Sequence, residues 1–189
     1  MKKIAVLDLD DTLGNFRETA SSLLNEKYKK GFSVADWEHH LIEQLYDITK
    51  SEFIRDIKEL KVLERMKPHD ESKAFTDGLR ERGYYIVVLT ARSWHKSARD
   101  VTERWLDAWD ITYDEVVLCG IDDPKASIVE REFGSIDLAV DDSPYQLWSY
   151  VKSASIANVY IYNMPWNKDK ALEIFGGKRI NNLMEIDYE

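Results

Sequence analysis

The stretch "IAVLDLDDTL" (residues 4–13) places a short apolar run directly before three carboxylates. Residues 4–7 carry no polar side chain, which is typical of a strand buried on both faces. Asp8, Asp10 and Asp11 follow within four positions, where mutual repulsion and burial both disfavour their ionised forms. This crowding predicts a compensating positive group at the end of the strand.

The rest of the chain alternates between strand and helix patterns. Further apolar runs indicate strands at 84–89, 115–119, 136–140 and 158–162, and amphipathic patterns indicate helices at 69–83, 95–110, 125–134 and 143–154. Strands that alternate with helices form a parallel sheet covered on both faces, with right-handed crossovers. The sequence therefore predicts an α/β protein.

One segment, residues 16–67, breaks this alternation because it contains helical patterns and no convincing strand. We interpret it as a small helical cap inserted after the first strand, with a core made of residues 1–15 and 68–189. The alternative is that these helices simply cover one face of the sheet. Their position directly after the acid cluster favours the cap.

Composition limits the function classes. The chain has 189 residues, of which 44% are hydrophobic, and this suits one compact domain with a modest insertion. A net charge of −9 without a basic run argues against binding duplex nucleic acid, whereas a small anion needs only a local positive group. The single cysteine, Cys119, excludes an internal disulfide and suits a small buried hydrophobe better than a catalytic thiol. With no signal peptide or membrane span in the sequence, we expect a cytoplasmic protein and no membrane partner.

Polar residues follow several of the predicted strands, where parallel sheets bind ligands. They are Asp8, Asp10 and Asp11 after the first strand, Thr90, Ala91 and Arg92 after the second, Lys125 beyond the third, and Asp141, Asp142 and Ser143 after the fourth. Each group alone has an ordinary structural explanation, such as a polar strand exit, a turn hydroxyl, a surface lysine or a helix N-cap. Their order at successive strand ends favours one shared site.

The chemistry of these groups fits phosphoryl transfer. Asp8 and Asp10 point to the same side of an extended chain, and with Asp141 they offer hard oxygen ligands suited to Mg²⁺. An aspartate can attack phosphorus, and a second one can protonate the leaving oxygen and later activate water. Thr90, nearby backbone N–H groups and Lys125 would hold the phosphoryl oxygens.

The stretches "DLDDTL", "LTARS" and "AVDDS", together with Lys125, resemble the four ordered motifs of the haloacid dehalogenase-like superfamily. The resemblance implies a Rossmann-like three-layer α/β/α core and a Mg²⁺-dependent phosphatase. It implies Asp8 as nucleophile, Asp10 as general acid/base, and Thr90, Ala91 and Lys125 as phosphate ligands. It also implies Asp8, Asp10 (through its backbone carbonyl) and Asp141 at the metal, with Asp142 as a further acid beside it. Asp11 departs from the pattern, because many members have glycine there, and it receives no role.

The substrate is less clearly indicated. The helical insertion, "LGNF" (13–16) and "MPWNKD" (164–169) resemble 5'(3')-deoxyribonucleotidases, which implies a deoxyribonucleoside monophosphate. Candidates for contact with the base are Phe16, Trp37 and Trp94, because bases stack on aromatic rings, and Arg92 is a candidate second grip on the phosphate or substrate.

Three interpretations stay open. The leading one is a nucleotide phosphomonoesterase with a small phosphorylated partner. Another is a polynucleotide-end or sugar-phosphate phosphatase, although the net charge counts against polynucleotide ends. The last is a non-catalytic module that binds a phosphorylated ligand, against which the intact pair of acids argues. The oligomeric state is left open.

Overall fold

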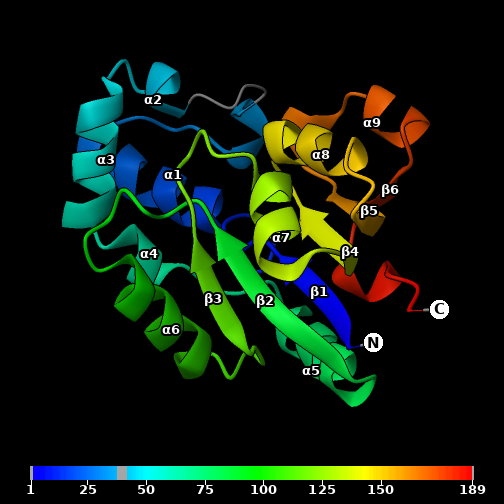
Figure 1. The fold of residues 1–189 in the computed structure, drawn as a ribbon. Helices are drawn as coiled ribbons and strands as arrows, with labels where there is room; N and C mark the ends of the chain where they lie inside the picture. Colours follow the sequence, from blue (N-terminus) through cyan, green and yellow to red (C-terminus); the bar gives the residue numbers. More distant parts are fainter. Residues whose placement is uncertain (1, 38–41, 189) are drawn as a thin grey trace.

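A six-stranded parallel sheet forms the centre of the computed structural model, which describes residues 2–37 and 42–188 (Figure 1). Its strands are β1 (Lys3–Leu7), β2 (Tyr84–Thr90), β3 (Glu115–Leu118), β4 (Ile136–Asp141), β5 (Ile156–Tyr162) and β6 (Gly177–Ile180), in the order β3-β2-β1-β4-β5-β6. The chain winds outward from β1 to β3 and then returns to β4 on the other side of β1. Such a reversal opens a crevice at the carboxyl ends of the two central strands. The predicted α/β fold with a parallel sheet is confirmed.

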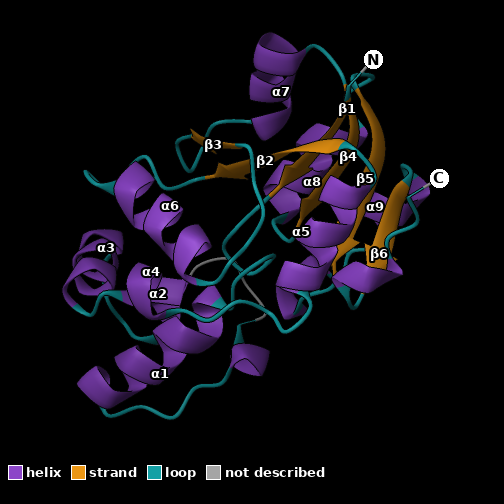
Figure 2. Ribbon diagram, turned by 90° about the horizontal axis from the view of Figure 1, so that it is seen from below, coloured by secondary structure: helices purple, strands orange, loops and turns teal. Residues whose placement is uncertain are grey.

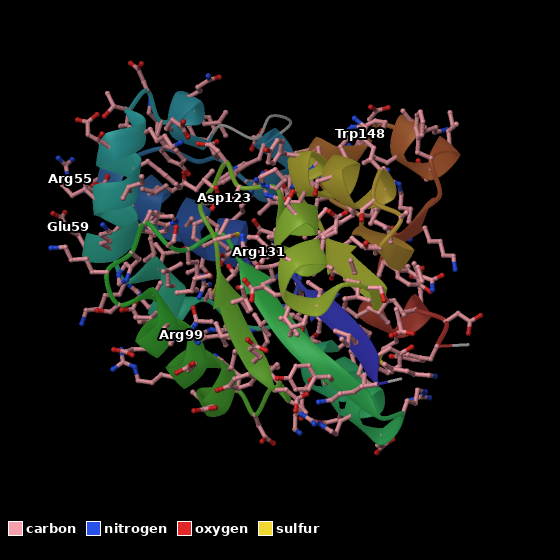
Figure 3. The ribbon with its side chains drawn as sticks, viewed as in Figure 1. Arg55, Glu59, Arg99, Asp123, Arg131 and Trp148 are labelled. Atoms are coloured by element: carbon pink, nitrogen blue, oxygen red, sulfur yellow. The ribbon has the colours of Figure 1, made fainter. Side chains whose placement is uncertain are left out.

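Helices cover both faces of this sheet. On one face α5 (Ser72–Glu81) and α6 (Ala98–Ala108) pack against a cluster that includes Leu7, and on the other α7 (Lys125–Phe133), α8 (Pro144–Val151) and α9 (Ala171–Ile174) pack against one that includes Val6. Neighbouring residues of a strand point to opposite faces, so an unbroken apolar run supplies both clusters. Charged side chains such as Arg99 and Arg131 lie on the outer surfaces of α6 and α7 (Figure 3).

A group of helices follows β1, as the sequence predicts. It comprises α1 (Phe16–Tyr28), the 3-10 helix η1 (Val34–Asp36), α2 (Ile42–Leu45), α3 (Lys50–Glu59) and α4 (Val62–Arg65). These helices gather to one side of the sheet, near α6 (Figures 1 and 2). Within the described residues their apolar cluster takes members from helices and loops and none from a strand. This separate cluster favours a cap over a layer on the sheet. The boundaries 16–67 stay a prediction, and residues 38–41 within them lie outside the described residues.

The chain leaves the core and returns to it along two adjacent segments. Gly14 forms an isolated bridge with Pro68, and the Asn15 backbone N–H donates to the Lys67 carbonyl at 2.9 Å. A Cβ at Gly14 would lie 2.7 Å from Cε of Met66 and 3.1 Å from Trp105, so any side chain there would force both neighbours to shift. The two points where the chain passes between core and insertion therefore lie side by side, and the insertion also packs against the core through Val101 of α6 and Trp166.

The carboxyl-terminal part adds β6 to the strands expected from the sequence, followed by the 3-10 helix η3 (Leu183–Glu185). Another 3-10 helix, η2 (Pro165–Asn167), follows β5 and lies next to the end of β4, where Asn167 donates to the Asp142 carbonyl. Within residues 2–37 and 42–188 the structure contains no helix of the length and apolar character that crossing a membrane requires.

Candidate active site at the ends of β1 and β4

Three buried carboxylates meet where the two central strands end. β1 and β4 are paired, with Leu7 opposite Val140, and the ladder continues because the Asp8 backbone N–H donates to the Val140 carbonyl at 2.9 Å. One carboxylate oxygen from each of Asp8, Asp141 and Asp142 lies within 4.8 Å of the others. Asp141 thus comes from β4, the strand next to β1.

Lys125, the first residue of α7, bridges two of these acids. Its Nζ lies 2.5 Å from Oδ1 of Asp8 and 2.7 Å from Oδ2 of Asp141, and its side chain is almost fully buried. Burial disfavours the charged form of Lys125, but the charges of Asp141 and Asp8 outweigh that effect and raise its pKa well above the ordinary value. Lys125 is therefore a permanently charged ammonium ion. Asp141 also accepts a hydrogen bond from the Ser143 backbone N–H at 2.9 Å.

The acids remain incompletely compensated. Burial is the main cause that raises the pKa of Asp8 to about 7, and burial together with the charge of Asp8 does the same for Asp142. Around the cavity there are five carboxylates (Asp8, Asp10, Asp11, Asp141, Asp142) and three cations (Lys125, Arg92, Arg17) among the described residues. Full ionisation would leave an excess of two negative charges, which equals the charge of one divalent cation.

The excess of two negative charges and the type of the donor atoms both fit Mg²⁺. Asp8, Asp141 and Asp142 supply only oxygen, which Mg²⁺ prefers, and an ion there would remove the excess charge. The carboxylate of Asp10 is not part of the group of three, because it faces Arg92. The predicted contribution of the Asp10 backbone carbonyl to the metal stays a prediction. Asp142, expected as a further acid beside the metal, presents its carboxylate directly to the group.

Asp10 is held by a cation of its own. Nε of Arg92 donates to Oδ2 of Asp10 at 2.8 Å, Nη2 donates to Oδ1 at 2.5 Å, and the Thr90 hydroxyl lies 3.4 Å from Oδ2. Arg92 is fully buried and does not line the cavity. The prediction that it grips the phosphate or substrate therefore has no geometric support, since its guanidinium group is turned to Asp10 instead.

Asp11 takes part in a contact that the sequence analysis did not assign. Its φ is 65°, a left-handed conformation that glycine adopts freely and that aspartate tolerates better than most residues. In this position its carboxylate accepts the Arg17 backbone N–H at 2.8 Å and lies 3.1 Å from Nε of Arg17. Asp11 thus ties the start of α1 to the loop that carries Asp8 and Asp10.

Asp142 has supporting residues that sequence reasoning also missed. Nε1 of Trp166 donates to Oδ2 of Asp142 at 2.7 Å, and Nδ2 of Asn167 donates to the Asp142 carbonyl at 2.8 Å. The Arg17 guanidinium stacks on the Trp166 ring, 3.4 Å from its centre. In the sequence, the segment "MPWNKD" carries only a family resemblance. Its place after β5, the neighbour of β4, is the signal that could have assigned it to the acid cluster.

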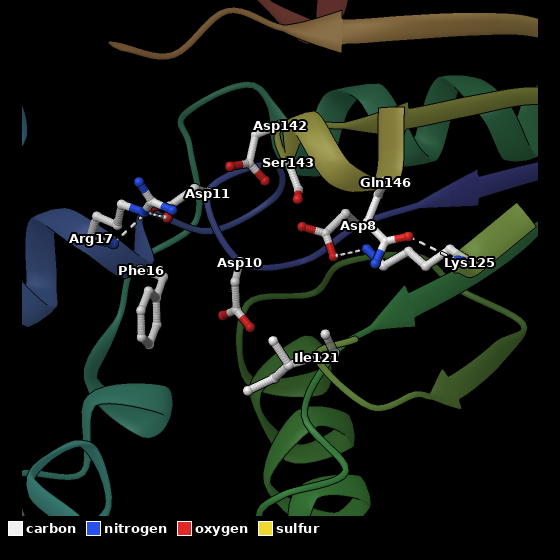
Figure 4. A pocket seen from close by; sticks show the side chains of 11 residues that line it. Asp8, Asp10, Asp11, Phe16, Arg17, Ile121, Lys125, Asp142, Ser143 and Gln146 are labelled. Carbon is white, nitrogen blue, oxygen red and sulfur yellow. Dashed lines mark hydrogen bonds and ion pairs between the residues drawn. The ribbon is translucent and has the colours of Figure 1, made fainter. Parts of the chain in front are cut away.

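A cavity of about 150 Å³ opens over these groups (Figure 4). Its lining residues are Asp8, Asp10, Asp11, Phe16, Arg17, Ala91, Ile121, Lys125, Asp142, Ser143 and Gln146. The structure thus brings most of the predicted site residues to one cavity, with Thr90, Arg92 and Asp141 behind its wall. Phe16 stands beside Asp10 (Figure 4). Trp37 and Trp94 do not line it, and both pack in the apolar cluster of the insertion.

Comparison with known proteins finds one curated relative and several solved structures of similar fold. The chain is 28% identical over 182 residues to a Bacillus subtilis protein named "Putative nucleotidase YqfW", covering 95% of this chain and 89% of that protein. Among solved structures, it is similar to a haloacid dehalogenase-like hydrolase of Streptococcus pneumoniae, with a TM-score of 0.67, 10% identity, and coverage of 97% and 96%. A hydrolase of the same family from Deinococcus radiodurans, solved with bound phosphate and sodium, matches with a TM-score of 0.67, 11% identity, and coverage of 97% and 92%.

No protein-family model matches the chain. The likeness to the solved structures nevertheless extends over nearly the whole chain, and it concerns the fold. The chain therefore has the fold of the haloacid dehalogenase-like hydrolases.

Proposed function

We propose that the protein is a Mg²⁺-dependent phosphomonoesterase that hydrolyses a small nucleotide, a deoxyribonucleoside monophosphate, through an aspartyl-phosphate intermediate. The observation that carries this proposal is the arrangement of two carboxylates on one cavity. Asp8 and Asp10 both line it, but they are held by different cations, Lys125 and Arg92. Two acids that are fixed independently at one reacting centre can take two separate roles.

In the first step Asp8 is the nucleophile. Lys125 holds one of its carboxylate oxygens and leaves the other to attack phosphorus. The bond from phosphorus to the ester oxygen breaks with its electron pair on that oxygen, which takes a proton from Asp10. Of the predicted phosphate ligands, Lys125 and Ala91 line the cavity and hold the phosphoryl oxygens as their charge changes, whereas the Thr90 hydroxyl lies behind the wall, next to Asp10.

In the second step Asp10 is the base. It takes a proton from a water molecule whose oxygen bonds to phosphorus, and the bond between Asp8 and phosphorus breaks with its electron pair on the carboxylate. Inorganic phosphate and the free alcohol are the products, and both acids regain their starting forms. Asp8, Asp141 and Asp142 would hold a Mg²⁺ ion, which would supply positive charge against the excess of carboxylates and Lewis-acid stabilisation of the phosphoryl group.

The size and lining of the cavity support a substrate whose phosphate is enclosed and whose remainder is not. A volume of about 150 Å³ is below the ~300 Å³ at which pockets begin to enclose a drug-sized molecule. The nucleoside therefore lies at the mouth, where half-buried Phe16 and 40%-exposed Ile121 offer apolar surface. Stacking of a base on Phe16 would supply about 1–3 kcal/mol. The name of the Bacillus subtilis relative supports the nucleotide class.

The proposal is tested by measuring phosphate release from p-nitrophenyl phosphate and from a panel of deoxyribonucleoside monophosphates, ribonucleotides and sugar phosphates, with Mg²⁺ and with EDTA. We expect metal-dependent release, highest kcat/KM with a deoxyribonucleoside monophosphate, and loss of release in Asp8→Asn. Competition by an oligonucleotide 3'-phosphate tests the polynucleotide alternative. Release that survives in Asp8→Asn would refute the nucleophile, and no release from any ester would refute the enzyme.

A matched control for Asp8→Asn is Asp110→Asn. Asp110 is a solvent-exposed acid that precedes β3, so it lies at the opposite edge of the sheet from the cavity. We expect Asp110→Asn to keep the wild-type rate. Equal loss in both variants would mean that the assay responds to stability rather than to the nucleophile.

A further inference from the structure

Arg92 is a buried cation committed to a single acid. None of its side chain is exposed, and its guanidinium group makes a two-pronged contact with both oxygens of Asp10, at 2.8 and 2.5 Å. Burial of a guanidinium ion is unfavourable unless a carboxylate pairs with it in good geometry. The planar fork of arginine fixes both the position and the plane of the carboxylate, which lysine cannot do.

The far side of the guanidinium is anchored as well. Nη1 donates to the Thr102 hydroxyl on α6 at 3.0 Å, and Nη2 lies 3.4 Å from Sδ of Met66. Met66 is itself fixed, because Nε1 of Trp105 donates to its carbonyl at 2.8 Å. All of these partners are buried. Arg92 therefore cannot turn toward a substrate in the cavity without losing contacts on every side.

Asp10, by contrast, contacts both Arg92 and the cavity. Its side chain is 26% exposed and lines the cavity, while both of its oxygens contact Arg92. The remaining side-chain contact, from the Thr90 hydroxyl, is long at 3.4 Å. Without the Arg92 guanidinium group, few contacts would fix the rotation of the Asp10 carboxylate, which lies on the loop after β1.

We propose that Arg92 is a positioning residue that fixes the carboxylate of Asp10 to receive the proton of the attacking water. This inference rests on the proposed function and assigns to it a residue that touches neither substrate nor metal. The step concerned is hydrolysis of the aspartyl phosphate. The water oxygen bonds to phosphorus, its proton passes to Asp10, and the bond to Asp8 breaks with the electron pair on Asp8.

The two steps of the reaction respond differently to a displaced Asp10. With p-nitrophenyl phosphate the leaving group needs no proton, so formation of the phosphoenzyme is insensitive to Asp10. Hydrolysis of the phosphoenzyme always needs the base, and a displacement of about 1 Å can slow such a step by ~100-fold. Slowing only the second step lowers kcat and KM together and leaves kcat/KM unchanged, because kcat/KM reports the steps up to phosphoenzyme formation.

The test is steady-state and rapid-quench kinetics of Arg92→Lys with p-nitrophenyl phosphate and Mg²⁺. We expect kcat to fall by ~100-fold, KM to fall in parallel, and a burst of p-nitrophenol at the wild-type rate. Thr102→Val removes only the hydrogen bond from Nη1 of Arg92 to the Thr102 hydroxyl. It should lower kcat and KM in parallel, but by less than Arg92→Lys does. If Arg92→Lys does not fold, as judged by circular dichroism and thermal melting, Thr102→Val carries the test.

Arg80→Lys is the matched control, because Arg80 pairs with Asp114 at 2.8 Å on the exposed surface before β3. It should keep wild-type kcat and KM. An equal fall in kcat and kcat/KM for the Arg92 and Thr102 variants, with KM unchanged and no burst, would overturn the positioning role. A wild-type protein without any phosphatase activity would instead overturn the proposed function, and this inference with it.

Discussion

Trp166→Phe isolates one hydrogen bond at the proposed metal site. The substitution keeps an aromatic ring beside the Arg17 guanidinium, which lies 3.4 Å from the Trp166 ring centre, but removes the N–H that donates to Asp142 at 2.7 Å. A buried hydrogen bond to a charged acceptor contributes about 1.5–3 kcal/mol. If this bond holds the Asp142 carboxylate in its ligating position, the Mg²⁺ affinity should fall by about 10- to 100-fold.

The direction of the pH dependence follows from the same bond. The Trp166 hydrogen bond opposes the burial that raises the pKa of Asp142 to about 7, so its loss raises that pKa further. A proton then competes with Mg²⁺ for the carboxylate near neutral pH. The deficit in affinity of Trp166→Phe should therefore be larger at pH 7 than at pH 9.

The assay is isothermal titration of the purified protein with Mg²⁺, which does not depend on any enzymatic activity. Trp148→Phe is the matched control, because Trp148 lies on α8 (Figure 3), where its ring contacts Phe175, and it is not among the residues that line the cavity. An Mg²⁺ affinity of Trp166→Phe equal to that of wild type at both pH values would refute the role of Asp142 as a metal ligand held by Trp166.

Further predictions concern the charges of the site. Lys125→Met leaves Asp8 and Asp141 without their shared ammonium ion. The free energy of unfolding, measured by urea titration without metal, should therefore fall by about 3–5 kcal/mol. An unchanged urea midpoint would contradict the buried ion pairs of Lys125. Because the pKa values of Asp8 and Asp142 are raised to about 7 from 3.8, the folded state binds more protons than the unfolded state between about pH 4 and 7. Thermal melts without metal should therefore show falling stability as the pH rises from 5 to 8, and Mg²⁺ should raise Tm more at pH 8 than at pH 5; equal gains would argue against these carboxylates as ligands. Burial raises the pKa of the Cys119 thiol from 9.0 to about 11, so iodoacetamide at pH 8 should alkylate the folded protein at least ~100-fold more slowly than the denatured protein, and comparable rates would contradict its burial.

The sequence predicted the parts of this molecule that depend on local pattern. Apolar runs located β1 to β5 to within two residues at each end, because strands buried on both faces need uninterrupted apolar side chains. The short strand β6 is harder to recognise, since at an edge it holds "GKRI", with two exposed or half-buried cations. The boundary between α3 and α4 falls at Lys61, which has a φ of 53°. This left-handed conformation could not be predicted, because glycine, its usual signal in a sequence, is absent from that position.

Only part of the site could likewise be predicted from local sequence pattern. Asp8, Lys125 and Asp141 could be placed together because parallel strands bring their carboxyl ends to one edge. The roles of Arg92, Arg17 and Trp166 could not, because each depends on the direction of a long side chain across segments far apart in the chain. Arg92 illustrates this, since its position after Thr90 suggested a substrate contact while its side chain runs to Asp10 and Thr102.

The central claim, that Asp8 forms a covalent bond to phosphorus, can be measured directly. Protein mixed with substrate and Mg²⁺ is quenched with acid and treated with borohydride, which reduces an aspartyl phosphate to homoserine, and the altered residue is located by peptide mass spectrometry. The account predicts homoserine at position 8 in the wild type, more of it in Arg92→Lys, and none without substrate. Homoserine at another aspartate, or turnover that leaves position 8 unmodified in Arg92→Lys while hydrolysis is rate-limiting, would contradict it.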